Sequence, residues 1–222
     1  EGAVDVTCAV TGAHSGDVVT AFVVKDGTPL DDSFLDGVVG IAQSVLEGTE
    51  NEVSLNVKID LDTPSGMYYI LAGSGGYSCK SETFQYVNNN QALEALNQST
   101  TTQQLADWLT QYGEQFGVDM DAHNALGDKK ERQEQGVIDM EPFSTIAAFS
   151  AAYQKMMAIL HFEDLSGSEA GDYLKNQEAV LGLQSLPYYQ ELNDNARLAA
   201  FLLEEKPFAN PADFDIKASV GC

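Results

Sequence analysis

The spacing of the apolar residues changes near Asn88-Asn89-Asn90, and this change constrains the fold more than any other feature of the chain. Before these asparagines, apolar and polar residues alternate in short runs, which is the pattern of strands with one buried face. After them, apolar residues recur every three to four positions, as in amphipathic helices. The chain is therefore predicted to be α+β, with a strand domain at residues 1–89 and an all-α domain at residues 90–222.

The strand domain is predicted to hold six strands joined by turns. The clearest strand runs from Val53 to Ile59, where apolar residues alternate with Ser54, Asn56 and Lys58. Short connections favour antiparallel pairing, because parallel strands need long crossovers. We therefore expect an antiparallel, Ig-like β-sandwich with strands at residues 4–10, 18–25, 38–46, 53–59, 67–72 and 77–87.

The all-α domain is predicted to open with a helix that begins at a capping box and ends at a glycine. Thr101 and Gln104 have the spacing of the box, and Gly117 supplies the stop. Between them, five apolar or aromatic residues lie on one helical face: Leu105, Trp108, Leu109, Tyr112 and Phe116. This spacing places Trp108 in the core rather than in a sugar-binding platform.

The all-α domain also matches itself at an offset of about 65 residues. Thr101 and Gln104 fall on Ser166 and Glu169, so one predicted capping box lands on another. The other matched positions are helix stops and anchors: Trp108-Leu109 with Tyr173-Leu174, Gly117-Val118 with Gly182-Leu183, Pro142-Phe143 with Pro207-Phe208, Phe149 with Phe214, and, after a one-residue slip, Leu126 with Leu192. We expect two tandem helical repeats, at about 91–160 and 161–222, with the second docked on the first.

Several short motifs stand out in the strand and helical parts: Ser65-Gly66-Met67-Tyr68-Tyr69, Phe84-Gln85-Tyr86-Val87, Phe116-Gly117-Val118-Asp119-Met120-Asp121, and Pro142-Phe143-Ser144-Thr145 with a similar segment at Pro207-Phe208-Ala209-Asn210. Together they resemble modules of large exported surface proteins of Gram-positive bacteria. In these modules a strand-rich Ig-like unit precedes helical repeats, often near S-layer homology domains. The resemblance implies an exported module, displayed at the bacterial cell surface or cell wall, without a reaction of its own.

The charge of the chain disfavours two classes of partner. It carries 34 acidic and 11 basic residues, for a net charge of −23. A surface this acidic repels phosphate backbones and anionic lipid headgroups, so neither nucleic acid nor a membrane surface is an expected partner. Since no apolar run reaches the length of a membrane span, we expect no direct membrane insertion of this segment.

The three cysteines are Cys8, Cys79 and Cys222, without a CxxC pair or a Cys/His cluster, so a zinc site is not expected. Cys8 and Cys79 fall in predicted strands, and Tyr77 precedes Cys79 by two residues, as in the tyrosine corner of some sandwiches. Phe84, however, has the opposite parity to Cys79, so a core-facing Cys79 would require a bulge or twist between them. A disulfide between Cys8 and Cys79 and a pair of buried thiols both remain open.

The sequence predicts no catalytic or metal-binding residues. His14, His123 and His161 lie far apart without ligand spacing, and Ser15 beside His14 lacks a GxSxG elbow. Asp119, Asp121 and His123 begin like an EF-hand loop, but Asn124 and Lys130 occupy its sixth and twelfth positions, which favours a solvated turn. The acidic loop residues are interpreted as exposed turns rather than as a calcium site: Asp31, Asp32, Asp36, Asp60 and Asp62.

These exclusions and the resemblance together predict the function. We expect a non-catalytic extracellular module of a bacterial cell-surface protein that serves adhesion, spacing or presentation, without a cofactor and with a protein or glycan partner. A carbohydrate-binding or other ligand-binding module is the alternative, and an accessory domain of a hydrolase is third. For the carbohydrate-binding alternative, Tyr68 and Tyr69 offer little: consecutive strand residues point to opposite faces, so only one of these rings lies on each face of the strand.

Overall fold

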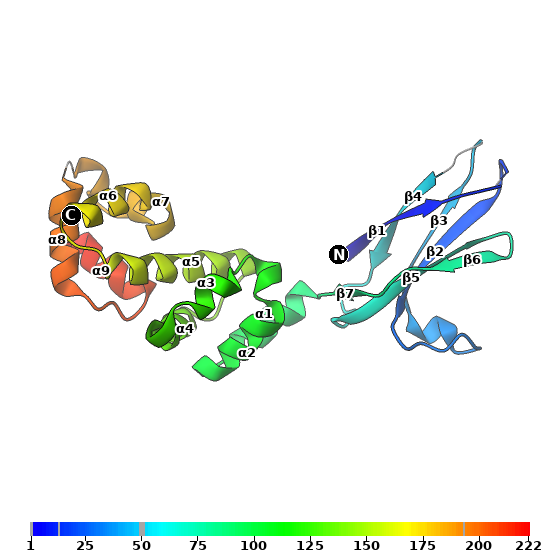
Figure 1. The fold of residues 1–222 in the computed structure, drawn as a ribbon, viewed down its shortest axis with the longest axis horizontal. Helices are drawn as coiled ribbons and strands as arrows, with labels where there is room; N and C mark the ends of the chain where they lie inside the picture. The colour runs from blue at the N-terminus through cyan, green and yellow to red at the C-terminus, as the bar shows by residue number, and fades with distance from the viewer. Residues whose placement is uncertain (1, 13, 49–51, 193) are drawn as a thin grey trace. The chain divides into compact units, whose positions relative to one another are not determined.

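The computed structural model describes residues 2–12, 14–48, 52–192 and 194–222. It divides into two compact units, residues 1–91 and 92–222, so the boundary falls next to the three asparagines. Within the described residues the chain is α+β, with all strands preceding all α-helices (Figure 1). Residues 49–51 of the turn expected before the fourth strand lie outside the described residues.

The strand unit contains two antiparallel sheets in its described part: β1 pairs with β4, and the second sheet has the order β3-β2-β5-β6 with β7 also paired to β5. The strands are β1 Gly2–Ala9, β2 Val18–Lys25, β3 Val38–Val45, β4 Glu52–Ile59, β5 Gly66–Ser74, β6 Tyr77–Lys80 and β7 Phe84–Tyr86. Alternating apolar residues of both sheets, such as Val6, Val57 and Val23, belong to one buried cluster. A 3₁₀ turn, η1 Phe34–Gly37, interrupts the long loop before β3.

The prediction of a single last strand at 77–87 is wrong, because the chain forms two strands with a register shift between them. From Leu71 to Tyr68, β5 advances three residues, whereas its partners advance four, from Lys80 to Phe84. One extra residue on the partner side is the geometry of a bulge, and it reverses the parity of the side chains. Cys79, Phe84 and Tyr86 therefore share one face of the sheet.

The expected tyrosine corner at Tyr77 is also wrong, since this side chain is 86% exposed. The corresponding contact belongs to Tyr68, whose buried hydroxyl donates to the carbonyl oxygen of Pro64 at 2.7 Å. Tyr69 lies on the opposite face, as the alternation predicts, yet it is buried too. The ammonium of Lys80 lies 3.9 Å from the centre of its ring.

The helical unit begins within α1 and continues through α9. The helices are α1 Asn89–Asn97, α2 Thr102–Tyr112, α3 Met120–Asn124, α4 Lys130–Ile138, α5 Ile146–Phe162, α6 Gly167–Asn176, α7 Glu178–Leu181, α8 Asn195–Glu205 and α9 Pro211–Gly221. Short 3₁₀ turns connect them: η2 Glu114–Phe116, η3 Gly127–Lys129, η4 Leu183–Ser185 and η5 Tyr189–Glu191. The segment just before α8 thus contains only a 3₁₀ turn, Tyr189–Glu191.

The long helix α5 contacts α4, α6, α7 and α9 (Figure 1). Its last residues, including Ile159 and Phe162, are buried in the same cluster as Leu174, Leu202 and Phe214 of the following helices. The helix also contacts α4, and its Phe149 meets the ring of Trp108 edge-on, so it packs on both sides.

The predicted capping boxes form only in part. The Thr101 side chain accepts from the backbone N–H of Gln104 at 3.2 Å, but the Gln104 amide oxygen accepts from Thr100 rather than from Thr101. Ser166 begins α6 without a side-chain cap hydrogen bond. The next residue, Gly167, has a φ of +55°, which makes the first turn of α6 irregular.

Candidate functional site

A cluster of buried polar side chains lies where α3, α4 and α5 meet, and we call it the histidine cluster: His123, Gln133, Glu134 and Tyr153. The Nε2 atom of His123 lies 3.1 Å from Oε1 of Glu134, and its Nδ1 atom lies 2.8 Å from the hydroxyl of Tyr153. Gln133 donates from Nε2 to the carbonyl oxygen of Tyr153 at 3.0 Å. The cluster is therefore a chain of hydrogen bonds that joins three helices.

Burial determines the protonation of this cluster. Burial, followed by the charge of Lys130, lowers the pKa of His123 to about 4, so the imidazole is neutral at neutral pH. Burial, and then the charges of Asp119 and Glu134, raise the pKa of Tyr153, which keeps its proton. The tyrosine hydroxyl then donates to Nδ1 of His123, and Nε2–H donates to Glu134. Both ring nitrogens are satisfied in this tautomer.

The geometry of the histidine cluster suits packing rather than reaction with a substrate. The His123 side chain is 1% exposed and both of its nitrogens already have partners. Of the cluster, Glu134 alone lines the neighbouring surface groove of about 600 Å³, together with Asp107, Lys130 and Glu131. Burial raises the pKa of Glu134, as expected for a carboxyl at the floor of such a groove.

The prediction of a solvated turn at Asp119, Asp121 and His123 is wrong for the histidine, which is fully buried. Asp119 is instead the N-cap of α3, where its carboxylate accepts from the N–H of Ala122 at 2.9 Å. An isolated histidine without ligand spacing was expected to be exposed, and for His123 this expectation is wrong. The internal match contains a sign of this polar core, because it aligns Gln133 with the apolar Leu198 and so indicates a polar residue at a core position.

The other histidines and the acidic loop residues have ordinary local roles. The backbone N–H of His14 donates to Asp17 at 2.7 Å, and the ring of His161 packs against Tyr173 with centroids 5.0 Å apart. Asp31 accepts from both the backbone and the hydroxyl of Ser33, and these bonds lower its pKa. Among the described residues, no three His, Cys, Asp or Glu side chains form a group that could hold a metal ion.

A second cavity, of about 630 Å³, opens in the strand unit. Its lining includes Cys8 on β1 and Cys79 on β6, together with His14, Asp17 and Tyr77. Both thiols are free in the structure, so the disulfide stays a prediction. The register shift between β6 and β7 nevertheless places Cys79 on the same face of the sheet as Phe84, so the parity of the two residues does not exclude the disulfide.

Trp108 occupies the core position predicted for it and is 4% exposed. Its ring stacks on Phe116 at 5.6 Å and meets Phe149 edge-on at 4.9 Å.

Within the described part of the chain, the helices are too short or too polar to cross a membrane. No family model, curated protein or solved structure matches this chain.

Proposed function

We propose that this chain is a non-catalytic module displayed outside a bacterial cell, at its surface or wall, where it serves adhesion, spacing or presentation. The proposal combines an Ig-like sandwich with two tandem helical copies. The first copy runs from α1 to the middle of α5, and the second runs from the end of α5 to α9. The observation that carries it is the recurrence of the same contacts in both copies, which is typical of repeat proteins.

One recurring contact joins an aromatic side chain to the preceding helix. The indole Nε1 of Trp108 donates to the carbonyl oxygen of Ala92 at 2.8 Å. In the second copy, the hydroxyl of Tyr173 donates to the carbonyl oxygen of Ala158 at 3.2 Å. Both the donors and the acceptors are related by an offset of 65 or 66 residues, so the correspondence supports a duplication of structure as well as of sequence.

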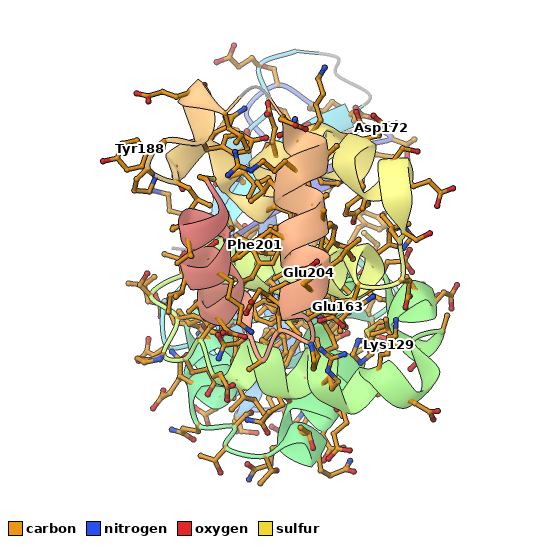
Figure 2. All side chains as sticks on the ribbon, turned by 90° about the vertical axis from the view of Figure 1, so that its left-hand side faces the viewer. Lys129, Glu163, Asp172, Tyr188, Phe201 and Glu204 are labelled. Carbon is orange, nitrogen blue, oxygen red and sulfur yellow. The ribbon has the colours of Figure 1, made fainter. Side chains whose placement is uncertain are left out.

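A second recurring contact holds the loop before the last helix of each copy. The side chain of Asn97 donates to the carbonyl oxygen of Phe143 and accepts from its N–H. Phe208 has the same two backbone bonds, but its N–H donates to Glu163 and its carbonyl accepts from Arg132. Figure 2 labels Glu163 beside the end of α8. Because Arg132 belongs to the first copy, this pair also supports docking of one copy on the other.

A third correspondence exchanges large and small residues. In the first copy, a Cβ atom at Gly136 would lie 2.7 Å from the sulfur of Met156. At the corresponding positions of the second copy the glycine is Gly221, and a Cβ there would lie 2.6 Å from the ring of Phe201. The same helix crossing is therefore filled from opposite sides in the two copies, which conserves volume as a packed core requires.

These features support a structural role for the module. Stacked helical copies bury each other's apolar faces and leave their outer faces for presentation or binding. In the strand unit, buried residues of both sheets share one cluster, which supports the sandwich. Both parts carry excess acidic residues, 13 acidic against 3 basic in residues 1–89 and 21 against 8 in residues 90–222, as suits a module held in solvent.

Surface display is tested with antibodies raised against the purified chain. Intact cells of the producing organism are expected to bind the antibody, and brief treatment of intact cells with a protease is expected to remove the signal. An intracellular protein released by lysis serves as the control and should stay unlabelled on intact cells. A signal that appears only after lysis would contradict display.

A ligand-binding module is the second candidate, favoured by the cavity in the strand unit and by the exposed ring of Tyr77 on its lining. The test is binding of the purified chain to a glycan array. If this candidate is right, Tyr77→Ala abolishes binding. Tyr188→Ala is the matched control, because Tyr188 is 70% exposed but belongs to the helical unit. Equal binding by both variants would exclude Tyr77 from recognition.

A further inference from the structure

Cys8 and Cys79 lie on the same faces of their strands as residues of the buried cluster, although Cys79 itself is exposed and Cys8 is partly buried. Cys8 has the same parity on β1 as buried Val6, and its side chain packs against the buried cluster of the strand unit. Cys79 is the register partner of Ala72 on β5. Directly paired residues of an antiparallel ladder have side chains on the same face, and Ala72 is buried in that same cluster.

The two cysteines also share a cavity, although they belong to different sheets. Both line the cavity of about 630 Å³ in the strand unit. Burial, and then the charge of Cys79, raise the pKa of the Cys8 thiol. The shared cavity and the matching faces of the two strands therefore bring these cysteines together.

We propose that Cys8 and Cys79 are a redox pair that closes into a disulfide between the two sheets. The oxidant is a small-molecule or protein disulfide, such as glutathione disulfide. Cys79 is the first to react, because it is exposed whereas Cys8 is partly buried. The bond joins β1 of the two-stranded sheet to β6 of the other sheet, which hydrogen bonds within each sheet do not do.

The chemistry is thiol–disulfide exchange in two steps. The thiolate of Cys79 attacks one sulfur of glutathione disulfide, forms a mixed disulfide and releases one glutathione thiolate. The thiolate of Cys8 then attacks the Cys79 sulfur, which breaks the mixed disulfide and releases the second glutathione. Two electrons pass from the cysteines to the oxidant, and the two thiol protons go to solvent or to the released glutathione.

The bond is tested by counting thiols in the full chain before and after incubation with glutathione disulfide. The reduced protein has three thiols. After oxidation and acid quenching we expect one thiol, that of Cys222, and a non-reducing peptide map that joins Cys8 to Cys79. Three remaining thiols, or a bridge that includes Cys222, would overturn the proposal. Cys222→Ser is the background variant and should go from two thiols to none.

Single variants in the Cys222→Ser background test the order of attack. Cys8→Ser leaves Cys79 without a resolving partner, so mass spectrometry should find it trapped with one glutathione. Cys79→Ser leaves the partly buried Cys8, which should form this adduct at least tenfold more slowly. Equal rates would overturn the assignment of Cys79 as the attacking thiol.

The structural consequence is measured as a change in thermal unfolding. Oxidation should raise the midpoint for the strand unit by about 10 °C, because a bond across some seventy residues restricts the unfolded chain. The Cys8→Ser/Cys222→Ser variant should show no such rise with the same oxidant. If the midpoint falls or stays unchanged in the bridged protein, the disulfide is not compatible with the folded sheets.

Discussion

Of the two proposed helical copies, the first packs around hydrogen-bonded polar side chains, whereas the second is apolar or aromatic at the positions that the internal match pairs with them. At an offset of 65 or 66 residues the pairs are His123 with Tyr189, Gln133 with Leu198, Glu134 with Ala199, and Tyr153 with Ala218, all of them buried. Under the proposed duplication, one arrangement of helices accepts two kinds of core. The difference is that a polar core depends on each partner of each hydrogen bond, while an apolar core depends mainly on filled volume.

The largest expected effect comes from removing the centre of the histidine cluster. His123→Leu replaces the imidazole with an apolar side chain and leaves the carboxyl of Glu134 and the hydroxyl of Tyr153 without their partner. We expect the free energy of unfolding of the first copy to fall by about 3 kcal/mol at pH 7. Urea unfolding followed by the fluorescence of Trp108, the single tryptophan, measures this copy. His161→Leu is the control and should change it by less than about 0.5 kcal/mol.

The same variant gives a prediction for pH. Because the folded-state pKa of His123 is about 4, below its ordinary value of 6.5, the unfolded chain binds more protons between these values. This histidine's contribution is therefore fully present above about pH 6.5 and is lost as the pH falls toward 4. The difference between the native chain and His123→Leu should shrink over that range. A constant difference would mean that His123 is not held neutral.

The loop before the last helix of each copy is held by a different kind of contact: a neutral one from Asn97 in the first copy and a charged one from Glu163 and Arg132 in the second. Glu163→Ala removes the acceptor for Phe208 and for both bonds from Arg132, and we expect it to cost about 2–3 kcal/mol. Asn97→Ala removes two neutral bonds to Phe143 and should cost about 1–2 kcal/mol.

Two probes separate these loop effects. Trp108 fluorescence reports unfolding of the first copy. Cys222 packs against the core of the second copy, so the reactivity of its thiol reports unfolding of that copy. Glu163→Ala should act mainly on the thiol probe and Asn97→Ala mainly on the fluorescence. A charged contact should also weaken with salt, so the effect of Glu163→Ala should be smaller in 1 M NaCl. Equal effects on both probes would mean that the two copies unfold together.

Tyrosine hydroxyls give a smaller and closely matched comparison. Tyr153→Phe removes a fully buried donor and leaves Nδ1 of His123 unpaired, which should cost about 1–2 kcal/mol. Tyr173→Phe removes a partly buried bond to the carbonyl oxygen of Ala158 and should cost about 0.5–1 kcal/mol. Both are measured by urea unfolding. A larger loss for Tyr173→Phe would contradict the idea that the first copy depends more on its polar bonds.

The spacing of the apolar residues predicts most of the strands and the buried position of Trp108. These features depend on local spacing, which is visible in one sequence. The bulge between β6 and β7 was not predicted in position, because no glycine or proline marks residues 81–83. It is determined by pairing with β5, a contact between segments that are distant in sequence.

The polar core of the first copy was missed for a different reason. Histidine, glutamine and glutamate are mostly surface residues, so their types argued for exposure at His123, Gln133 and Glu134. The hydrogen bonds of the His123 ring, the Glu134 carboxyl and the Gln133 amide nitrogen offset the cost of burial, and they form only where three helices meet, while Oε1 of Gln133 has no partner among the described residues. Long-range contacts such as Asn97 with Phe143 have the same character and leave no local pattern in the sequence.

The last comparison concerns Glu141, whose effect depends on pH; it precedes Pro142 and falls on Lys206 at the offset of 65 residues. The Lys206 ammonium donates to the carbonyl oxygen of Glu163 at 2.7 Å, whereas Oε1 of Glu141 is buried without a hydrogen-bond partner among the described residues. Burial raises the pKa of Glu141 to about 7. Its folded-state pKa lies above its ordinary value of 4.5, so the stabilisation that it gives when protonated is lost as the pH rises from about 4.5 through 7.

Glu141→Gln removes this titration while keeping the shape of the side chain. The variant should therefore be more stable than the native chain by about 1 kcal/mol at pH 8, because an ionised carboxylate is no longer held in a partly buried site, and about equal to it at pH 5. Urea unfolding at the two pH values, followed by Trp108 fluorescence, measures the difference. Lys206→Gln is the matched change in the second copy and should be destabilising at both pH values. It removes the hydrogen bond from the Lys206 ammonium to the carbonyl oxygen of Glu163, whereas Oε1 of Glu141 makes no hydrogen bond among the described residues.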